Sequence, residues 1–331
     1  MERPLIAVPA GDPAGVGPEI LAKAFACREV VDAARCVAIG DCAIMENALA
    51  VTGLPLKVRP LRTIEEGDFS GGTLNLVPVD TIDMDAFRHG TVSAMCGKAA
   101  YAYIEKSIDL ALNKEVDAVA TAPINKESLR MGGIPYIGHT EIFAGLTGTK
   151  DPLTVFEVHG MRIFFLSRHV SLRKACDLVR KDRIIDYVKR AFAVLRQFGV
   201  ADGVMAIAGL NPHSGEHGLF GDEEANEVCP AVDALKSLGY RVEGPVGADS
   251  VFHQALQGKY VAVLSLYHDQ GHIAAKTLDF ERTISITGGM PILRTSVDHG
   301  TAFDIAGKNI ASAAGMIEAI ILAAKYAPVF R

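Results

Sequence analysis

The stretch from Leu5 to Glu19, LIAVPAGDPAGVGPE, decides the fold class. It opens with the apolar run Leu5–Val8 and passes through a turn rich in glycine and proline. It then reaches Pro18, which suits the first position of a helix. A continuous apolar run, without polar residues at alternate positions, is typical of a strand covered on both faces. A strand, a turn and a helix in this order are the repeating unit of an α/β protein.

The same alternation continues along the chain. Six further runs have the length and hydrophobicity of buried strands: Val37–Ile39, Leu74–Val77, Ala118–Ala120, Ile163–Leu166, Val204–Ala208 and Val261–Leu266. Helical stretches separate them: Pro18–Ala26, Ala43–Ala50, Val92–Leu112, Arg180–Gln197, Glu223–Leu238 and Ala311–Lys325. Val155–Phe156 and Ile163–Phe165 are spaced as a hairpin, which makes the sheet mixed. We therefore predict an α/β fold with mixed sheets flanked by helices.

Composition excludes several classes of protein. With 331 residues, the chain is long enough for two lobes. Hydrophobic residues make up 49% and charged residues 22%, which excludes disorder. A net charge of −6 and the absence of tryptophan argue against nucleic-acid binding.

No apolar stretch approaches the ~20 residues of a membrane span. The Met-Glu-Arg-Pro start shows no secretion signal and the six cysteines form no CxxC pair, so we expect a cytoplasmic protein with reduced thiols.

The glycine-rich turn matches neither common nucleotide motif. Gly15-x-Gly17 is followed by Ile20 where a dinucleotide fingerprint requires its third glycine, and no Gly-Lys-Ser/Thr follows for a phosphate-binding loop. The negative charge of Glu19, in the first turn, is expected to stabilise the positive N-terminal end of this helix. The turn is either a backbone requirement alone or a loop that approaches a ligand.

Three histidines share one context. His169, His213 and His268 each follow an apolar strand, where open α/β sheets place their ligand sites. Together they could hold a divalent ion, with Zn²⁺ the first choice for nitrogen ligands, and Asp269 could orient one of them. The alternative is that each histidine only caps a loop.

Two further groups suit anions and a cofactor. His139 and Thr140, at the start of a helix, could hold an anion, and Lys276 and Arg294 could bind a phosphate or carboxylate. The alternatives are an ordinary threonine cap and solvated charges. In the segment 298–308, His299 could face an adenine and Asp304 could bond a ribose hydroxyl, unless the segment is only a capped turn.

These residues together resemble the 4-hydroxythreonine-4-phosphate dehydrogenase family of vitamin B6 synthesis, including its threonate and erythronate 4-phosphate branch. The resemblance rests on six motifs in order: residues 11–19, 121–126, 138–141, 211–216, 268–271 and 294–302. It implies a two-lobed fold similar to that of isocitrate and isopropylmalate dehydrogenases, with the active site in the cleft between lobes. Residues 1–125 and 280–331 would form the cofactor-binding lobe, and residues 126–279 the metal-binding and dimerisation lobe.

The resemblance also implies roles for individual residues. The metal ligands would be His169, His213 and His268, for Zn²⁺ or alternatively Mg²⁺, Mn²⁺ or Co²⁺. Substrate contacts would fall on His139, Thr140, Lys276, Ser285 and Arg294, and NAD contacts on His299, Gly300 and Asp304. Homodimers would share the site across their interface, with Asp249 as the acid from the partner chain. Asp249, Lys276 and His139 stay open as the catalytic base.

The expected reaction is a metal-dependent, NAD-linked oxidation of a 4-phosphorylated 3-hydroxy acid, followed by loss of CO₂. Two departures leave the substrate open, because vitamin-B6 members usually carry Asn where this chain has Ser285, and Leu-Pro where it has His272-Ile273. The run 218–224 is closer to relatives that act on threonate or erythronate 4-phosphate. The alternatives are a cis-dihydrodiol dehydrogenase of the same family, a non-redox phosphate acyltransferase on a related scaffold, and a binding protein without turnover.

Overall fold

The computed structural model describes residues 2–330, which divide into two compact units. Unit 1 contains the described residues up to Pro152 together with Met290–Phe330, and unit 2 contains Leu153–Gly289. The boundaries differ from the expected 125/126 and 279/280. Helix α5 (Lys126–Met131) packs on helix α4 (Ala94–Leu112) of unit 1, and strand β11 (Ile284–Gly288) pairs with strand β6 (Leu153–Val158) of unit 2. His139 and Thr140 therefore belong to unit 1.

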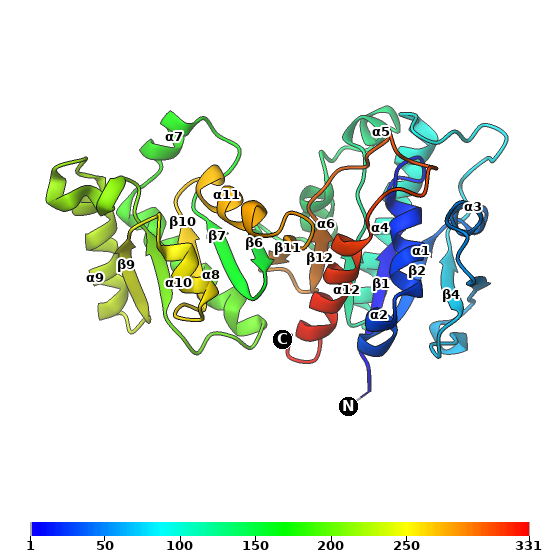
Figure 1. The fold of residues 1–331 in the computed structure, drawn as a ribbon, viewed down its shortest axis with the longest axis horizontal. Coiled ribbons are helices and arrows are strands. Elements are labelled where there is room, and N and C mark those ends of the chain that lie inside the picture. The colour runs from blue at the N-terminus through cyan, green and yellow to red at the C-terminus, as the bar shows by residue number, and fades with distance from the viewer. Residues whose placement is uncertain (1, 331) are drawn as a thin grey trace. The chain divides into compact units, whose positions relative to one another are not determined.

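Unit 1 is a parallel sheet covered by helices (Figure 1). Its strands lie in the order β3 (Lys57–Pro60), β4 (Thr73–Pro78), β2 (Arg35–Gly40), β1 (Leu5–Pro9), β5 (Ala118–Thr121) and β12 (Arg294–Val297). Helices α4 and α12 (Ala314–Tyr326) both contact β1 and β5. The remaining helices are α1 (Gly17–Ala26), α2 (Arg28–Ala33), α3 (Cys42–Thr52), the 3₁₀ turn η1 (Ile64–Glu66) and α6 (His139–Thr147). Parallel strands covered on both faces explain the continuous apolar runs.

Unit 2 contains a mixed sheet. Its strands lie in the order β11, β6, β7 (Met161–Phe165), β10 (Ala262–Ser265), β8 (Met205–Ala208) and β9 (Val242–Val246). Strand β6 runs antiparallel to both of its neighbours, whereas β7, β10, β8 and β9 are parallel. Helices α10 (Val251–Leu256) and α11 (His268–Leu278) share an apolar cluster with these strands. The other helical elements are α7 (Leu172–Asp177), α8 (Lys181–Gln197), the left-handed turn η2 (Pro212–Gly218), η3 (Glu224–Val228) and α9 (Cys229–Ser237).

The structure confirms the seven predicted strands, the hairpin and the mixed sheet. The largest differences from the prediction concern two helices. The last one begins at Ala314 and not at Ala311. The stretch predicted as one helix over 223–238 is a π-helical turn, η3, followed by α9. Pro230 stands in the first turn of α9, where it has no N–H to continue the α-helical ladder.

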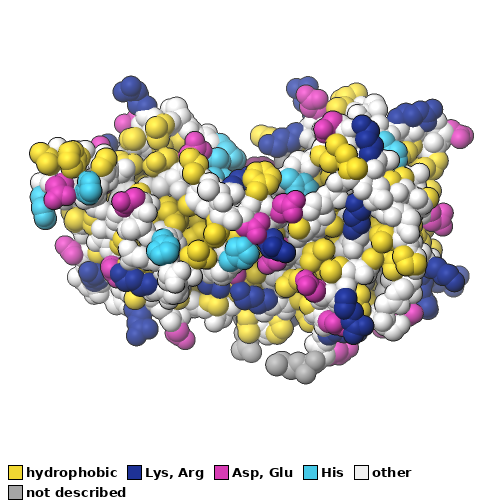
Figure 2. Space-filling view, viewed as in Figure 1, with side chains coloured by type: hydrophobic (Ala, Val, Ile, Leu, Met, Phe, Trp, Pro, Cys, Tyr) yellow, Lys and Arg dark blue, Asp and Glu magenta, His cyan; other side chains and the backbone are white. Residues whose placement is uncertain are grey.

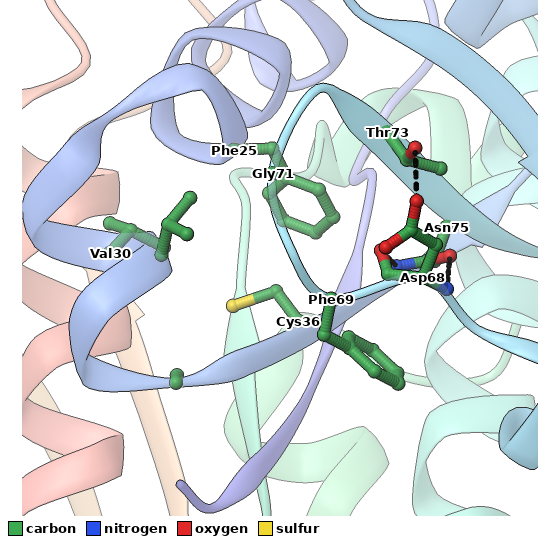
Figure 3. A pocket seen from close by; sticks show the side chains of 10 residues that line it. Phe25, Val30, Cys36, Asp68, Phe69, Gly71, Thr73 and Asn75 are labelled. Carbon is green, nitrogen blue, oxygen red and sulfur yellow. Dashed lines mark hydrogen bonds between the residues drawn. The ribbon is translucent and has the colours of Figure 1, made fainter.

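A cavity of about 30 Å³ lies in unit 1 beside Cys36 (Figure 3). The side chains of Phe25, Val30 and Phe69 line it, and the Asp68 carboxylate accepts a hydrogen bond from the Thr73 hydroxyl at 3.3 Å. Burial raises the pKa of the Cys36 thiol to about 12, so the thiol stays protonated and unreactive. This space is about the size of one or two water molecules and is too small for a substrate.

The expectations about the cysteines and about membrane spans can both be compared with the structure. All six cysteines are free thiols. Among residues 2–330, no helix is both long and apolar enough to cross a membrane.

Asp12 in the glycine-rich turn is a buried carboxyl group with few partners. Its Oδ1 accepts the Ala14 N–H at 2.9 Å, and its buried Oδ2 has no hydrogen-bond partner among the described residues. Burial is the main reason why the pKa of Asp12 rises from 3.8 to about 6. Ionised Asp12 therefore destabilises the folded state, because a buried charge without sufficient partners is costly.

Replacing Asp12 by asparagine is expected to stabilise the protein above pH 6. The folded-state pKa lies above the unfolded value, so the wild type loses stability as pH rises from about 4 through 6, by on the order of 3 kcal/mol. Asp12→Asn has no charge to bury, so its melting temperature at pH 8 should exceed that of the wild type, and the gain should fade towards pH 4. Thermal unfolding of both proteins between pH 4 and pH 8 tests this prediction, and the exposed Asp202→Asn serves as the control. An increase in melting temperature that is the same at every pH would contradict the assigned role of the Asp12 charge.

Candidate active site

The three predicted metal histidines come from three neighbouring strands of unit 2. His169 follows β7, His268 begins α11 directly after β10, and His213 lies in the turn η2 after β8. Because β7, β10 and β8 are parallel neighbours in that order, their carboxyl ends lie at one edge of the sheet. Figure 2 shows exposed histidine side chains on the surface of unit 2, with hydrophobic side chains among them.

Two of these histidines lie beside one cavity. The imidazole centroids of His169 and His268 are 5.8 Å apart, and both residues line a cavity of about 340 Å³. Arg168, Tyr267 and Asp269 line the same cavity. Nδ1 of His268 lies 2.6 Å from Oδ1 of Asp269. A carboxylate at one ring nitrogen leaves the other, Nε2, to act as a ligand, and metal-binding histidines are commonly oriented in this way.

His213 stands apart from this pair in an unusual backbone segment. The five residues from His213 to His217 all have positive φ, between 43° and 81°, so they form a left-handed turn. Four of them are not glycine, and each such residue costs roughly 1–2 kcal/mol. The buried Glu224 carboxylate stabilises the start of the turn, since its Oε1 accepts the N–H groups of Leu210 and Asn211, both at 2.7 Å. The loop is therefore held in a strained shape that presents the exposed His213.

The donor set fits a divalent ion only in part. His169 and His268 supply imidazole nitrogens beside one cavity, and Asp269 supplies the orienting carboxylate. The described residues contain no group of three or more His, Cys, Asp or Glu side chains close enough to hold a metal ion. His213 would have to join the pair, so the three-histidine metal site stays a prediction.

Unit 1 contains a compact anion site. Arg294 begins β12 and is 3% exposed, and its Nη2 donates to the Thr121 hydroxyl at 3.0 Å. Its guanidinium lies 5.0 Å from the Phe143 ring centroid in α6. His139 is the first residue of α6, and its buried Nε2 has no hydrogen-bond partner among the described residues. A buried cation, an unpartnered imidazole nitrogen and a helix N-terminus all favour a bound anion.

The electrostatics of this site follow from burial. Desolvation lowers the pKa of Arg294 to about 9, so the guanidinium is still charged at neutral pH. Burial and the nearby Arg294 charge hold the pKa of His139 well below its usual value. His139 is therefore neutral at pH 7 and can offer Nε2 to an anionic substrate as a hydrogen-bond donor. Thr140, the next residue of α6, is half-buried.

The predicted cofactor residues lie on a loop that the N-terminal segment holds in place. The Val16 N–H donates to the Thr301 carbonyl at 3.0 Å, and a Cβ on Gly15 would come within 2.9 Å of Thr301. The buried Glu19 carboxylate accepts the N–H of Asn309 at 2.9 Å and that of Gly307. The glycine-rich turn therefore supports a neighbouring loop, and Glu19 bonds this loop instead of only favouring its own helix terminus.

The exposed side of this loop has the chemistry that a dinucleotide needs. Asp304 is exposed, Gly300 has open space where a Cβ would lie, and Nδ1 of His299 lies 3.0 Å from the Gly300 carbonyl oxygen. A carboxylate can accept bonds from ribose hydroxyls, and an imidazole can stack on adenine. These residues fit a nicotinamide cofactor, and their contacts with it stay a prediction.

The remaining predicted residues are spread over unit 2. Lys276 lies in the last turn of α11, with its ammonium 5.1 Å from the Phe280 ring centroid. Ser285 on β11 pairs with Phe156 on β6. Asp249 is exposed and lines a second cavity, of about 570 Å³, that shares no lining residue with the histidine cavity. Within one chain, Asp249 therefore lines a different cavity from His169 and His268.

Sequence reasoning missed the structural roles of two carboxylates. Glu19 anchors the loop, and Glu224 anchors the left-handed turn. Both side chains are at most 3% exposed, and both carboxylates accept hydrogen bonds from backbone N–H groups that are distant in the sequence. The sequence singled out Glu19 as the acid at its helix start, but nothing local indicated that it bonds the backbone of residues 307–309.

Comparison with known proteins agrees with the predicted fold and family. The profile of the family described as "Pyridoxal phosphate biosynthetic protein PdxA" matches residues 32–323. Proteins named "Putative D-threonate 4-phosphate dehydrogenase" from Fusobacterium nucleatum and Clostridium botulinum are 60% and 59% identical over 329 residues. These matches cover 99% of this chain and 99% and 98% of theirs.

A solved structure is also similar along the whole chain. The 4-hydroxythreonine-4-phosphate dehydrogenase of Klebsiella pneumoniae is 41% identical, with a TM-score of 0.91 and 98% of each chain covered. This similarity confirms the expected α/β fold of the isocitrate and isopropylmalate dehydrogenase type. The relatives are dehydrogenases, which confirms the prediction of an enzyme that uses a nicotinamide cofactor. The chain belongs to the family of the pyridoxal phosphate biosynthetic protein PdxA.

Proposed function

We propose that this protein oxidises a 4-phosphorylated 3-hydroxy acid with NAD⁺ and that D-threonate 4-phosphate is its preferred substrate. The main support for the proposal is the anion site of unit 1. There the buried Arg294 guanidinium and the unpartnered Nε2 of His139 are suitable groups for binding a phosphate. The choice of acid is supported by relatives at 59–60% identity that are named for D-threonate 4-phosphate.

The proposed reaction has two balanced steps. The C3 hydroxyl gives its proton to a base and C3 gives a hydride to NAD⁺, which forms a β-keto acid, NADH and H⁺. The C1–C2 bond of that acid then breaks, CO₂ leaves, and protonation of C2 gives dihydroxyacetone phosphate when the substrate is D-threonate 4-phosphate. Loss of CO₂ is favoured because the electron pair is delocalised into the neighbouring carbonyl as an enolate.

Each predicted site residue has a role in the proposed reaction. In unit 1, Arg294, His139 and Thr140 would bind the phosphate, and His299, Gly300 and Asp304 would bind NAD. In unit 2, Lys276 and Ser285 would contact the hydroxy acid. His139 has a pKa too low to keep a proton at neutral pH, so the proposal assigns it to binding and leaves Lys276 and Asp249 as proton acceptors.

A divalent ion completes the proposal. His169, His213 and His268 would hold it, with Zn²⁺ the first choice and Mg²⁺, Mn²⁺ or Co²⁺ as alternatives. A bound divalent ion would lower the pKa of the substrate hydroxyl and stabilise the negative charge that develops on oxygen. We further propose a cytoplasmic homodimer in which Asp249 serves the partner's site, since Asp249 lines a different cavity from His169 and His268 of its own chain.

A substrate panel is the direct test of the proposed function. NADH formation at 340 nm, in the presence of each divalent ion, should be fastest with D-threonate 4-phosphate, slower with erythronate 4-phosphate or 4-phosphohydroxythreonine, and slowest with a cis-dihydrodiol. Release of CO₂ in the same reactions should equal NADH formation. The proposal fails if no phosphorylated hydroxy acid gives NADH, and the preference fails if another substrate has the highest kcat/KM.

Arg294→Lys is expected to weaken phosphate binding. Lysine keeps the charge but loses the two-pronged grip of the guanidinium and its bond to Thr121. KM for the phosphorylated acid should rise about tenfold or more, which corresponds to roughly 1.4 kcal/mol, while KM for NAD changes little. Exposed Arg130→Lys of unit 1 is the control. Equal KM values in both variants would remove Arg294 from the substrate site.

His213→Ala is expected to abolish most of the oxidation. The proposal makes His213 a metal ligand, so its loss should lower kcat/KM by at least 100-fold and weaken metal binding. His217→Ala is a matched control, because His217 is exposed in the same left-handed turn with a φ of 56°, close to the 51° of His213. Full activity of His213→Ala would instead favour a reaction without metal, such as phosphate acyl transfer.

A further inference from the structure

The His272 ring is stacked on the ring of His268, one helical turn earlier in α11. The two imidazole centroids are 3.6 Å apart and the ring planes differ by 12°. Nδ1 of His272 also donates a hydrogen bond to the His268 backbone carbonyl at 2.8 Å, since a carbonyl can only accept. The His272 imidazole is therefore fixed both to the backbone and to the face of its neighbour.

Two buried phenylalanines hold His272 from other directions. The Phe156 ring of β6 lies at a centroid distance of 4.3 Å and an angle of 62°, and the Phe165 ring of β7 lies at 4.5 Å and 43°. Both phenylalanines belong to the apolar cluster of unit 2 and are 3% exposed. Because these rings cannot move without disturbing the core, His272 presents a rigid flat surface to His268.

Together, His272 and Asp269 constrain His268 in complementary ways. Asp269 lies 2.6 Å from Nδ1, which determines the nitrogen that is left to bind a ligand, and the stack on His272 determines the plane of the ring. The constrained ring lies 5.8 Å from His169, centroid to centroid, beside the 340 Å³ cavity.

We propose that His272 is a positioning residue that holds the His268 imidazole in the orientation needed to bind a divalent metal ion. This inference rests on the metal site of the proposed function. It assigns His272 no contact with substrate and no ligand role. Loss of a group that orients a metal ligand commonly lowers metal affinity about 10–100-fold, even though every ligand is still present.

Metal binding to variants of the full chain tests the proposal. Metal-free wild type, His272→Leu, His272→Phe and His159→Leu would be titrated with Co²⁺ by visible absorption and with Zn²⁺ by calorimetry. His272→Leu should weaken binding about 10–100-fold, because it removes both the stack and the hydrogen bond. His272→Phe should recover most of the affinity, because it keeps an aromatic face. His159 is a half-exposed histidine of the same unit that bonds Asp279, so His159→Leu should match the wild type.

A second measurement needs no metal. In the metal-free protein, ¹³C relaxation of the His268 ring carbons should show a rigid ring in the wild type and in His272→Phe, and increased nanosecond motion in His272→Leu. A structural contribution of His272 alone would lower the melting temperature without changing this motion. If His272→Leu does not fold by circular dichroism, His272→Gln replaces it, since glutamine can keep a donor near the His268 carbonyl but has no ring.

The outcomes separate this inference from the proposed function. Unchanged metal affinity together with unchanged His268 ring motion in His272→Leu would overturn the positioning role, whatever the melting temperature. A wild type that binds neither Co²⁺ nor Zn²⁺ would instead overturn the metal site, and the relaxation data would still decide whether His272 immobilises His268. Weakened binding in His272→Leu with recovery in His272→Phe supports both.

Discussion

The bonds from the buried Glu19 carboxylate to the 307–309 backbone are the constraint on which unit 1 depends. They join the first helix of the chain to the loop that precedes its last helix. A buried carboxylate is tolerated only where donors surround it, and two backbone N–H groups meet that need. Asp12, seven residues earlier, has fewer donors, and its pKa rises to about 6. One short segment thus contains a carboxylate that holds a loop in place and another whose ionisation costs stability.

In unit 2, the parallel order of β7, β10 and β8 has a similar organising effect. It brings the segments that contain His169, His268 and His213 to the same edge of the sheet. Beyond the strand ends, the backbone departs from regular structure in two places, the left-handed turn η2 and the π-helical turn η3. Such departures cost free energy and are concentrated at functional sites, where the surrounding structure compensates for them. Here Glu224, the first residue of η3, bonds the backbone that leads into η2.

Buried strands were predictable because a strand covered on both faces needs an uninterrupted apolar run. The edge strands β3 and β9 were missed, since both contain charged or partly exposed residues and bury little. Strand β12 was missed for a different reason: its sequence is Arg-Thr-Ser-Val, yet all four residues are buried. Polar residues are acceptable there because the Arg294 guanidinium bonds Thr121 and the Thr295 hydroxyl bonds the Ala319 carbonyl. Such compensation comes from residues far away in the chain and leaves no local pattern.

The amino-acid sequence by itself determined the α/β class, the family and the residue types available for an anion, a cofactor and a metal. These depend on local hydrophobic periodicity and on short motifs, which are properties of neighbouring residues. Only the tertiary structure decided that Arg294 is buried beside His139, that Glu19 holds the 299–309 loop, and that His272 stacks on His268 against two phenylalanines. Burial, pKa and ring orientation are set by atoms that the fold brings together from distant segments, so they exist only after the chain has folded.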